Sequence, residues 1–302
     1  MSTISVVVRS CNTKSHLRAC LESLKVCLPM SSEVLVVDDA SRDGSARMVA
    51  DDFQHVRLLK NTQRTGLAAT MNLGLRAARG AYVLFLHADA IVTGNAIKQM
   101  IAFLETNLRY GAVAPRLVDL DGATFPMHKR LPNLWTPILH GTPLERAWPS
   151  NREVNRYLAR DFDYDQDGDV ECPSGACLLM RRKALRKESA FDETMGAEFH
   201  EADLCARLAE AGWRIGYLEA ARVVYAGGSA GAPAPDHETE YQRNRLAFYR
   251  KHHGEVAAWW VKACVALTVV ELYVVECYRR AEGWPEEPLL PVWEHFTGFL
   301  RA

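Results

Sequence analysis

The feature that most constrains the fold is a regular alternation of short apolar runs and amphipathic segments over the first 115 residues. The apolar runs lie at residues 4–8, 33–37, 56–59, 81–86 and 112–115, and their brevity and polar or glycine boundaries are typical of buried strands. Residues 14–27 and 67–78 carry apolar side chains at helical spacing, and residues 46–51 fit a short helix. This alternation predicts an α/β fold with a mostly parallel central sheet flanked by helices.

The rest of the chain shows other patterns. Residues 119–170 are rich in Pro, Asn, Trp and Arg and have no sustained period, which is typical of functional loops. Strands are expected at 176–180, 214–218 and 223–225, a helix at 201–211, and a long helical region at 238–280. We therefore expect one domain over residues 1–235, with halves 1–115 and 116–235, and a C-terminal helical extension over 236–302.

The helical region near the C-terminus has one narrow polar stripe. Lys251, Glu255, Lys262, Glu276 and Arg280 fall within ~40° of one line on a helical wheel, and most of the other positions beyond Glu255 are apolar. So broad an apolar face can pack on the body of the protein, on a second copy in a homodimer, or on a membrane surface. The sequence leaves these three open. The uncharged run at 263–270 is shorter than the ~20 residues that span a bilayer.

Composition excludes several classes of protein. A chain of 302 residues that is 48% hydrophobic and 24% charged is expected to be soluble and globular. A net charge of −1 gives no reason to expect nucleic acid as a partner. The eight cysteines form no CxxC pair, and no basic, apolar leader precedes the first strand, so we expect reduced thiols and a cytoplasmic protein, with peripheral membrane contact left open.

Polar residues follow three of the predicted strands. The first strand is followed by Arg9-Ser10-Cys11-Asn12, the second by Asp38-Asp39, and the fourth by His87-Ala88-Asp89. The carboxyl ends of parallel strands meet at one edge of the sheet, where open α/β sheets bind ligands. No GxGxxG follows the first strand and no GxxxxGK[ST] occurs, so ordinary dinucleotide and P-loop sites are disfavoured. The alternative is that these carboxylates are solvated turn or helix-capping groups.

Seven segments, in order, carry a resemblance to a known family. They are SVVVRSCN (5–12), LRACLESL (17–24), EVLVVDDASRDGS (33–45), NTQRTGLAATMNLGL (61–75), RGAYVLFLHAD (79–89), SGACLLMRR (174–182) and FDETMGAEFHEADLCARL (191–208). Over most of residues 4–230 the chain resembles a family-2 glycosyltransferase of the GT-A fold, similar to rhamnosyltransferases. Each segment is short, but their common order and spacing make the resemblance specific.

The resemblance implies a nucleotide-sugar site. Its donor-binding residues would be Ser10, Asn12, Asp38, Asp39, Gly66, Asn72, His87 and Ala88, with Asp39 on the base or ribose. Asp89 matches the last carboxylate of the family's DxD motif, which holds a divalent metal, Mg²⁺ or Mn²⁺, on the donor diphosphate. This chain has His87 where many members have the first Asp, so a single carboxylate would have to serve.

The resemblance also implies the catalytic half of the site. The family's Glu-Asp-x-Asp-Leu pattern corresponds here to His200-Glu201-Ala202-Asp203-Leu204. Glu201 would then be the general base, with Asp203 as a second catalytic residue and Gly175, Ala176 and His200 on the acceptor side. Tyr225 stands where the family often has a metal-binding His. The alternative is that Glu201 is an exposed helix-start residue that the helix dipole favours.

The expected activity is inverting transfer of a sugar from a UDP- or dTDP-sugar to a hydroxyl acceptor. Such an enzyme would act in polysaccharide, glycolipid or glycoconjugate synthesis. The altered motif positions keep open a weakly active or inactive nucleotide-sugar-binding scaffold. A sugar nucleotidyltransferase is disfavoured, because Arg9-Ser10-Cys11-Asn12 is not the Gly-rich, Arg/Lys-bearing loop that such an enzyme needs.

Two further patterns suggest no separate site. Asp163, Asp165, Asp167 and Gly168 mimic the start of a calcium loop, but position twelve would be Ser174 rather than Glu. We expect this acidic run to be a solvated loop. Arg181-Arg182-Lys183 is expected to be a solvated basic patch, with contact to a pyrophosphate or an anionic acceptor as the alternative.

Overall fold

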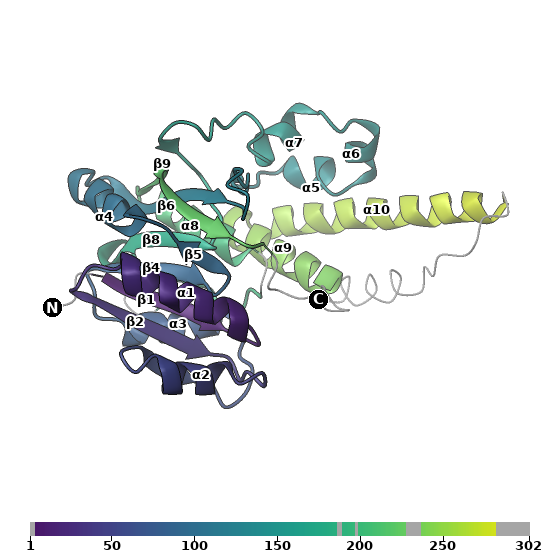
Figure 1. The fold of residues 1–302 in the computed structure, drawn as a ribbon. Coiled ribbons are helices and arrows are strands. Elements are labelled where there is room, and N and C mark those ends of the chain that lie inside the picture. The colour runs from purple at the N-terminus through teal and green to yellow at the C-terminus, as the bar shows by residue number, and fades with distance from the viewer. Residues whose placement is uncertain (1–3, 186–188, 197–198, 228–236, 282–302) are drawn as a thin grey trace. The chain divides into compact units, whose positions relative to one another are not determined.

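The structure is a computed structural model, which describes residues 4–185, 189–196, 199–227 and 237–281 (Figure 1). The chain divides into two compact units, one made of residues 1–129 and 162–231 and the other of residues 130–161 and 232–302. The second unit thus joins part of the irregular middle to the C-terminal helices. The division expected at residue 235 stays a prediction.

The first unit is built on one mixed sheet. Its strands follow the order β3-β2-β1-β4-β8-β6-β9-β5, and β7 pairs with β9. The strands are β1 (Ile4–Ser10), β2 (Ser32–Asp38), β3 (Arg57–Lys60), β4 (Tyr82–His87), β5 (Ala90–Val92), β6 (Tyr110–Val118), β7 (Gly168–Asp169), β8 (Cys177–Arg181) and β9 (Arg214–Tyr225). β1 pairs in parallel with β2 and β4, β2 with β3, and β6 with β9, whereas β5, β7 and β8 run antiparallel to their partners. The expected α/β sheet is confirmed, and it is mixed.

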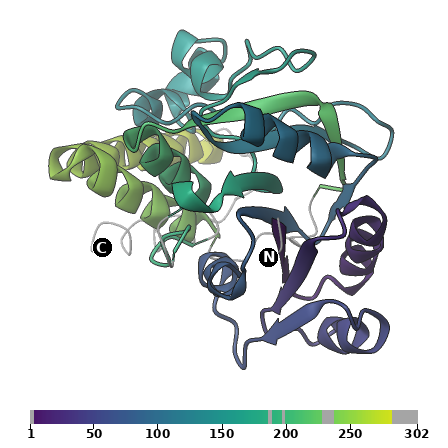
Figure 2. The same cartoon turned by 90° about the vertical axis from the view of Figure 1, so that its left-hand side faces the viewer.

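Helices cover both faces of this sheet. They are α1 (Lys14–Cys27), α2 (Ser45–Asp52), α3 (Leu67–Ala77), α4 (Ala96–Thr106) and α8 (His200–Glu210). Val6 and Val8 of β1 belong to one core with α1, α2 and α4, while Val7, between them, faces α3. Alternate residues of a strand point to opposite faces, so β1 is apolar throughout because both of its faces are buried. Figure 2 shows α1 and α2 on one side of β1 and β2, and α3 on the other.

The second unit consists of helices. They are α5 (Thr136–Leu139), α6 (Pro143–Ala147), α7 (Arg152–Tyr157), α9 (His237–His253) and α10 (Glu255–Ala281). The Tyr249 hydroxyl donates to the Asn133 carbonyl at 2.7 Å, and Arg245 Nη2 donates to the Pro137 carbonyl at 2.8 Å. These two bonds tie α9 to the segment that carries α5. None of the helices in the described part of the chain is long and apolar enough to cross a membrane.

The structure also shows what the sequence pattern missed. Residues 119–170 contain three short helices and β7. The sequence did not reveal these elements, because their apolar residues are too few to produce a visible period. The strands expected at 214–218 and 223–225 form one strand, β9, whose pairing with β6 shifts register between Pro115 and Arg116. The single helix expected at 238–280 is broken at Gly254, whose φ is +85°. α4 and β5 had not been singled out at all.

Gly74 supplies a test of how α3 packs on the sheet. A Cβ at this position would lie 2.3 Å from Cγ1 of Val7, a stiff side chain that is fully buried. Helix propensity alone favours Gly74→Ala by ~1 kcal/mol. We nevertheless expect the variant to lose ~1–3 kcal/mol of unfolding free energy, because the clash outweighs propensity. Urea denaturation measures the loss.

Arg76→Ala is the matched control on the same helix. Arg76 is exposed, and its ion pair with Glu193, at 3.6 Å, lies at the surface. We expect a change within ~0.5 kcal/mol for this variant. A stabilising effect of Gly74→Ala would contradict the close approach of α3 to β1.

Candidate active site

The parallel pairing of β1 with its two neighbours brings the predicted strand ends together. Ser10 is in register with Asp38 of β2, and Arg9 is in register with His87 of β4. Asp39 follows β2, and its backbone N–H donates to the Ser10 carbonyl at 2.8 Å. The residues after β1, β2 and β4 therefore form one polar edge of the sheet in the first unit, as the sequence predicts.

Asp39 is the most heavily hydrogen-bonded carboxylate at this edge. It is fully buried, and Oδ1 accepts from the Thr65 backbone at 2.8 Å and from Asn61 Nδ2 at 3.1 Å. Oδ2 accepts from the Gly66 backbone at 3.2 Å and from Arg9 at 3.2 Å. Burial alone would raise the pKa of Asp39, but these donors hold it below its usual range. The side chain is thus a fixed anion that holds the loop before α3.

Asn12 and Asp38 connect the two loops that follow β1 and β2. Asn12 has a left-handed φ of +55°, and its side-chain oxygen accepts from the Arg42 backbone at 2.8 Å. Asp38 Oδ2 accepts from the Ser41 backbone at 3.1 Å. Ser10 is buried, with its hydroxyl 3.3 Å from that of Thr13. These contacts fix both loops, while the predicted donor-binding role of the three residues stays a prediction.

Both polar atoms of the Asn72 amide are hydrogen-bonded to the protein. It is fully buried on α3, where Nδ2 donates to the Phe191 carbonyl at 2.8 Å and to Glu193 at 2.9 Å. Its Oδ1 accepts from the backbones of Ala190 and Phe191 at 2.9 and 3.0 Å. The amide therefore tethers residues 189–193 to α3. Its predicted contact with a nucleotide stays a prediction that this hydrogen bonding does not support.

The end of β4 carries His87, Ala88 and Asp89. The His87 backbone N–H donates to the Ala176 carbonyl at 2.9 Å, and His87 Nδ1 lies 4.0 Å from Asp89 Oδ1. Burial lowers the pKa of His87, although the nearby Glu201 and Asp89 carboxylates oppose this. Asp89 and Ala88 are buried, Ala88 within the apolar core.

Tyr225 lies beside His87. It pairs with Ala90 of β5, and its ring centroid is 6.3 Å from that of His87. Tyr225 and His87 are two of the positions at which the chain departs from the pattern it resembles. They are far apart in sequence, and only the structure shows that the two departures meet.

Glu201 lies in the first turn of α8. Its Oε1 accepts from the Gly175 backbone N–H at 2.6 Å and lies 4.0 Å from His200 Nε2. A Cβ on Gly175 would come within 2.1 Å of this oxygen, so only glycine allows the contact. Burial raises the pKa of Glu201, while His87, the Gly175 N–H and Lys129 act in the opposite direction. A third of the Glu201 side chain is exposed.

His200, Asp203 and Ala176 are mainly held by the protein itself. His200 is buried, and its ring centroid lies 5.5 Å from that of Phe191. Asp203 is fully buried and pairs with Arg207 Nε at 2.9 Å one turn further along α8. Asp203 therefore stabilises the helix that presents Glu201, and its predicted catalytic role stays a prediction. Ala176 is fully buried and contributes its carbonyl to His87.

A metal at this edge would need ligands from a bound donor. Among the residues that the structure describes, no group of three or more His, Cys, Asp or Glu side chains is arranged to hold a metal ion. The Asp89 carboxylate and His87 imidazole fit Mg²⁺ or Mn²⁺ as partial ligands, the imidazole suiting Mn²⁺ better. Diphosphate oxygens and water would have to complete the coordination.

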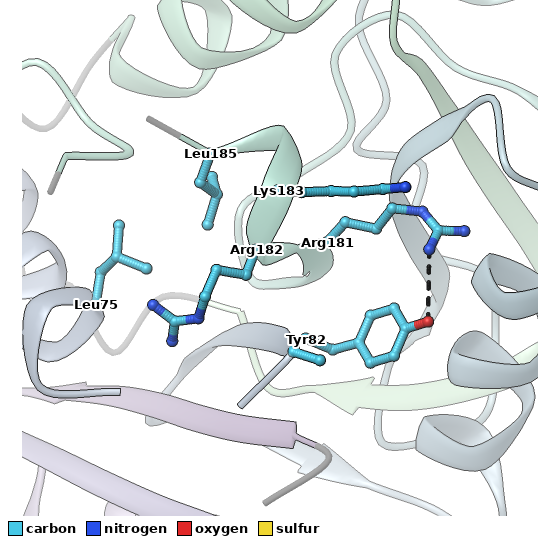
Figure 3. Close-up of a pocket in the computed structure, with 7 residues that line it drawn as sticks. Leu75, Tyr82, Arg181, Arg182, Lys183 and Leu185 are labelled. Atoms are coloured by element: carbon cyan, nitrogen blue, oxygen red, sulfur yellow. Dashed lines mark hydrogen bonds between the residues drawn. The ribbon is translucent and has the colours of Figure 1, made fainter. Parts of the chain in front are cut away.

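The basic run Arg181-Arg182-Lys183 lies at the other end of β4. Arg181 pairs with Tyr82, the first residue of β4, roughly 16 Å along the strand from His87. A cavity of about 610 Å³ opens there, lined by Leu75, Ala81, Tyr82, Arg181, Arg182, Lys183 and Leu185 (Figure 3).

Lys183 is exposed, as expected of a solvated patch, but the structure corrects the interpretation of Arg181. Arg181 is only 6% exposed and donates to the Tyr110 carbonyl at 2.9 Å, so it is a buried structural cation rather than a solvated one. Its distance from His87 also rules out contact with a pyrophosphate at the polar edge. The acidic residues Asp163, Asp165 and Asp167 are exposed, as expected of a solvated loop, although Asp165 pairs with Arg116 at 2.8 Å and Asp167 accepts from the Glu219 backbone at 2.8 Å.

The family is settled by comparison with known sequences. Residues 5–188 match glycosyl transferase family 2, which is more than half of the chain. The chain belongs to this family. It is 26% identical over 269 residues to the N-acetylglucosaminyl-diphospho-decaprenol L-rhamnosyltransferase of Mycobacterium tuberculosis strain H37Rv, covering 85% of this chain and 86% of that relative. The predicted family and the glycosyltransferase activity are confirmed.

Solved structures confirm the fold. A mannosyltransferase from Pyrobaculum calidifontis, in complex with GDP-Man and Mn²⁺, matches with a TM-score of 0.55 at 18% identity, covering 99% of this chain and 85% of that one. S. aureus TarS residues 1–349, in complex with UDP, match with a TM-score of 0.55 at 17% identity, covering 87% and 70%. This family-2 glycosyltransferase therefore has the GT-A fold.

Several structural partners of the site were missed from the sequence. Arg9, Asn61 and Thr65 bind Asp39. Lys129, which lowers the pKa of Glu201, lies outside the seven segments that carry the resemblance. Asn61 and Thr65 do lie in a polar, glycine-ended stretch before α3, which is the signal that could have identified them. Lys129 has no such signal, because only the tertiary fold brings it near Glu201.

The raised pKa of Glu201 predicts a pH-dependent stability. A carboxyl whose pKa is higher in the folded chain than in the unfolded chain stabilises the fold in its protonated form. This contribution is fully present below the unfolded pKa and is lost as pH rises through the folded pKa. Glu201→Gln cannot ionise. We therefore expect this variant to gain unfolding free energy over the parent protein at about pH 8, and the gain to shrink towards about pH 4, near the ordinary Glu value.

Urea denaturation across this pH range measures the effect. Glu105→Gln, at an exposed position of α4, is the control, and its stability relative to the parent protein should not vary in this way. A Glu201→Gln variant that is less stable than the parent protein at both ends of the range would show that the carboxylate stabilises the fold.

Proposed function

We propose that this glycosyltransferase inverts the anomeric centre of a sugar that it takes from a UDP- or dTDP-sugar and passes to a hydroxyl acceptor. The observation that carries the proposal is the Glu201 carboxylate, held at 2.6 Å by the Gly175 N–H and left one-third exposed. His87, from the end of β4, is near enough to affect its charge. A carboxylate so placed, within the same unit as the donor-binding edge, supports the role of general base.

The donor is assigned to the edge formed by the loops after β1 and β2. Ser10, Asn12, Asp38, Asp39, Gly66 and Asn72 would surround the nucleoside, and His87 and Ala88 the sugar-phosphate portion. Asp39 is the strongest of these assignments, because its hydrogen bonds keep it ionised and fixed in position. An anionic acceptor of this kind suits base N–H and ribose hydroxyl donors. The similarity to a rhamnosyltransferase favours a deoxyhexose as the sugar.

A divalent cation is proposed at Asp89, with His87 as its neighbour. The mannosyltransferase neighbour was solved with Mn²⁺, and the ligand chemistry at the end of β4 fits Mg²⁺ or Mn²⁺. Bound there, the ion would neutralise charge on the departing diphosphate. Asp89 and His87 would hold the ion from the protein side.

The chemical step follows from the position of Glu201. The acceptor oxygen forms a bond to the anomeric carbon as the bond from that carbon to the diphosphate oxygen breaks. The electron pair of the broken bond leaves with the nucleoside diphosphate, and the acceptor proton passes to the ionised Glu201 carboxylate. One displacement inverts the anomeric centre. His200, Gly175 and Ala176 would shape the acceptor side.

The acceptor is proposed to be a growing glycan, glycolipid or other glycoconjugate. The M. tuberculosis relative is named for a diphospho-decaprenol acceptor, which favours a lipid-linked one here. We place residues 1–235 in the catalytic domain and residues 236–302 in an extension that contacts a membrane or a second copy of the chain. The enzyme would then work in the cytoplasm, at the inner face of the membrane.

One specific observation favours a second candidate, a nucleotide-sugar-binding scaffold with little turnover. His87 and Tyr225 replace residues that the family uses for metal, and they adjoin one another. The two candidates differ in what Glu201 does.

Substitution at the proposed base and metal residue separates these functions. We expect Glu201→Gln to lower kcat by ~10²–10⁴-fold while leaving donor affinity near that of the parent protein, because a base acts in the chemical step. Asp89→Ala should weaken donor binding, and EDTA should have little further effect on it. Radiolabelled transfer and donor hydrolysis measure turnover, and calorimetry measures donor affinity.

Glu105→Gln, on the exposed surface of α4, serves as the control and should behave as the parent protein does. Tight binding of UDP or dTDP, together with turnover that neither active-site variant changes, would overturn the proposed enzyme mechanism and favour the scaffold.

The nucleotide can be identified by ligand-induced stabilisation. A ligand at 100 times its Kd stabilises the folded chain by ~2.7 kcal/mol. We expect UDP- or dTDP-sugars to raise Tm and GDP-sugars to leave it unchanged. Asp39→Asn should abolish the shift, because it removes the fixed charge at the proposed nucleoside contact. A shift with GDP-sugars alone would reject the proposed donor class.

A further inference from the structure

Exposed aromatic side chains of the described chain gather in the second unit. Every Trp and Tyr with more than a third of its surface exposed belongs to this unit: Trp135 (65%), Trp148 (63%), Trp259 (69%), Trp260 (37%), Tyr273 (60%) and Tyr278 (67%). Large apolar residues exposed in the first unit are aliphatic and scattered, as at Met30 and Leu120. Gathered apolar surface of this kind marks an interaction site, whereas single exposed residues do not.

Most of the exposed residues of α10 form one continuous stripe, with Tyr273 and Glu255, which pairs with Arg250 at 3.0 Å, on its flank. At 100° per residue, a single arc of ~100° contains Val256, Trp259, Trp260, Ala263, Leu267, Val270, Val274, Cys277 and Tyr278. The arc carries no charged residue and extends ~33 Å along the helix. In the first part of α10 the other side, including Val261 and Cys264, is buried within the second unit. The stripe is therefore the face that this unit leaves uncovered.

The stripe widens at its start into a groove. A cavity of about 420 Å³ is lined by Leu134, Trp135, His253, Val256, Ala257 and Trp260. Trp260 Nε1 donates to the Leu134 carbonyl at 2.8 Å, which fixes the segment before α5 against α10. Since Leu134 and Trp135 are also exposed, the apolar surface continues from α10 on to this segment.

Basic residues adjoin the same end of the stripe. α9 closes on Arg250, Lys251, His252 and His253, directly before α10 begins. Lys262 Nζ lies 5.3 Å from the centroid of the Trp259 ring. Tryptophan and tyrosine next to cationic side chains are typical of surfaces that lie in the headgroup region of a bilayer. Their apolar rings enter the boundary of the acyl chains while their polar atoms stay hydrated.

A second copy of the chain fits this face less well. Val256, Trp260, Ala263, Leu267, Val270, Val274 and Cys277 alternate at spacings of four and three, as coiled-coil seams do. Four of these seven positions are Leu or Val, as in stable seams, but Trp260, Ala263 and Cys277 interrupt the row. The wide aromatic groove beside Trp260 also exceeds what a narrow helix seam would cover.

We propose that the uncovered face of α10, with Leu134 and Trp135, binds the surface of a lipid bilayer that contains anionic headgroups. α10 would lie in the plane of the interface, with its stripe facing the acyl chains. The inference rests on the proposed function in one respect, because a lipid-linked acceptor would be met at such a surface. It names the partner that brings this enzyme to that acceptor.

Vesicle co-sedimentation of the full chain tests the proposal without requiring catalysis. The probe is a vesicle of phosphatidylcholine mixed with phosphatidylglycerol. We expect the parent protein to bind, and the double variant Trp259→Ser/Leu267→Ser to lose at least ~10-fold in partition coefficient, because two large apolar side chains leave the interface. Tryptophan fluorescence should shift to the blue on binding, and this shift should shrink in the variant.

The matched control is Met30→Ser/Leu120→Ser, which removes two exposed apolar side chains from the first unit. It should bind vesicles as the parent protein does. Both double variants alter exposed positions and should keep the parent Tm, which confirms that they fold.

Two results of the vesicle assay would overturn the proposal: no binding by the parent protein, or an equal loss of binding in both double variants. The proposal would also fail if the parent protein does not bind vesicles and light scattering shows a dimer that Trp259→Ser/Leu267→Ser dissociates. Transfer to a short water-soluble acceptor separates this test from the proposed function. Vesicle binding without transfer would reject the function alone. Transfer that both double variants retain, without vesicle binding by the parent protein, would reject the bilayer contact alone.

Discussion

The parallel pairing of β1 with both β2 and β4 is the constraint on which the rest of the site depends. It brings Ser10, Asp38 and His87 to one edge because three buried strands end at nearly the same level. A shift of one residue in either pairing would turn the strand's alternating side chains to the opposite faces. The close fit of Gly74 against Val7 resists such a shift. The ligand-binding edge therefore depends on core packing some distance from it.

Two buried polar side chains carry this order into the loops. Asp39 binds the backbone of Thr65 and Gly66, and Asn72 binds the backbone of Ala190 and Phe191. A buried polar group without partners is costly, so each of them holds its loop in the one arrangement that satisfies it. Both residues lie in segments that resemble the family. Their presence in those motifs thus has a structural explanation. For Asn72, every hydrogen bond that the amide makes in the structure is to the protein itself.

The sequence predicted most strands and helices of the first 115 residues, because strands that are buried on both faces give continuous apolar runs, but it missed β5 and α4. It did not predict α5, α6 and α7, whose short helices carry too few apolar residues to show a period, nor the break at Gly254. It predicted from their position after strands that Asp38, Asp39 and Asp89 meet at one edge, whereas Glu201 and Asp203 were expected only from the resemblance. It could not predict Gly175 as the partner of Glu201, or Lys129 as its neighbour, because these contacts depend on how β8 and α8 meet in three dimensions.

His87 and Tyr225 show why separate motif departures should be judged together. Taken singly, each removes a residue that the family uses for metal and weakens the case for activity. In the structure their rings adjoin, at 6.3 Å, and His87 also faces Asp89 and Glu201. Exchanging an Asp for an imidazole removes one negative charge next to Glu201, so a base proposed there would face less repulsion when it ionises. The same exchange leaves Asp89 as the carboxylate for a cation, so a metal would depend more on the donor's diphosphate. Under the proposed function, His87 would therefore trade metal affinity for an ionised Glu201, which is a change of the site's chemistry rather than its loss.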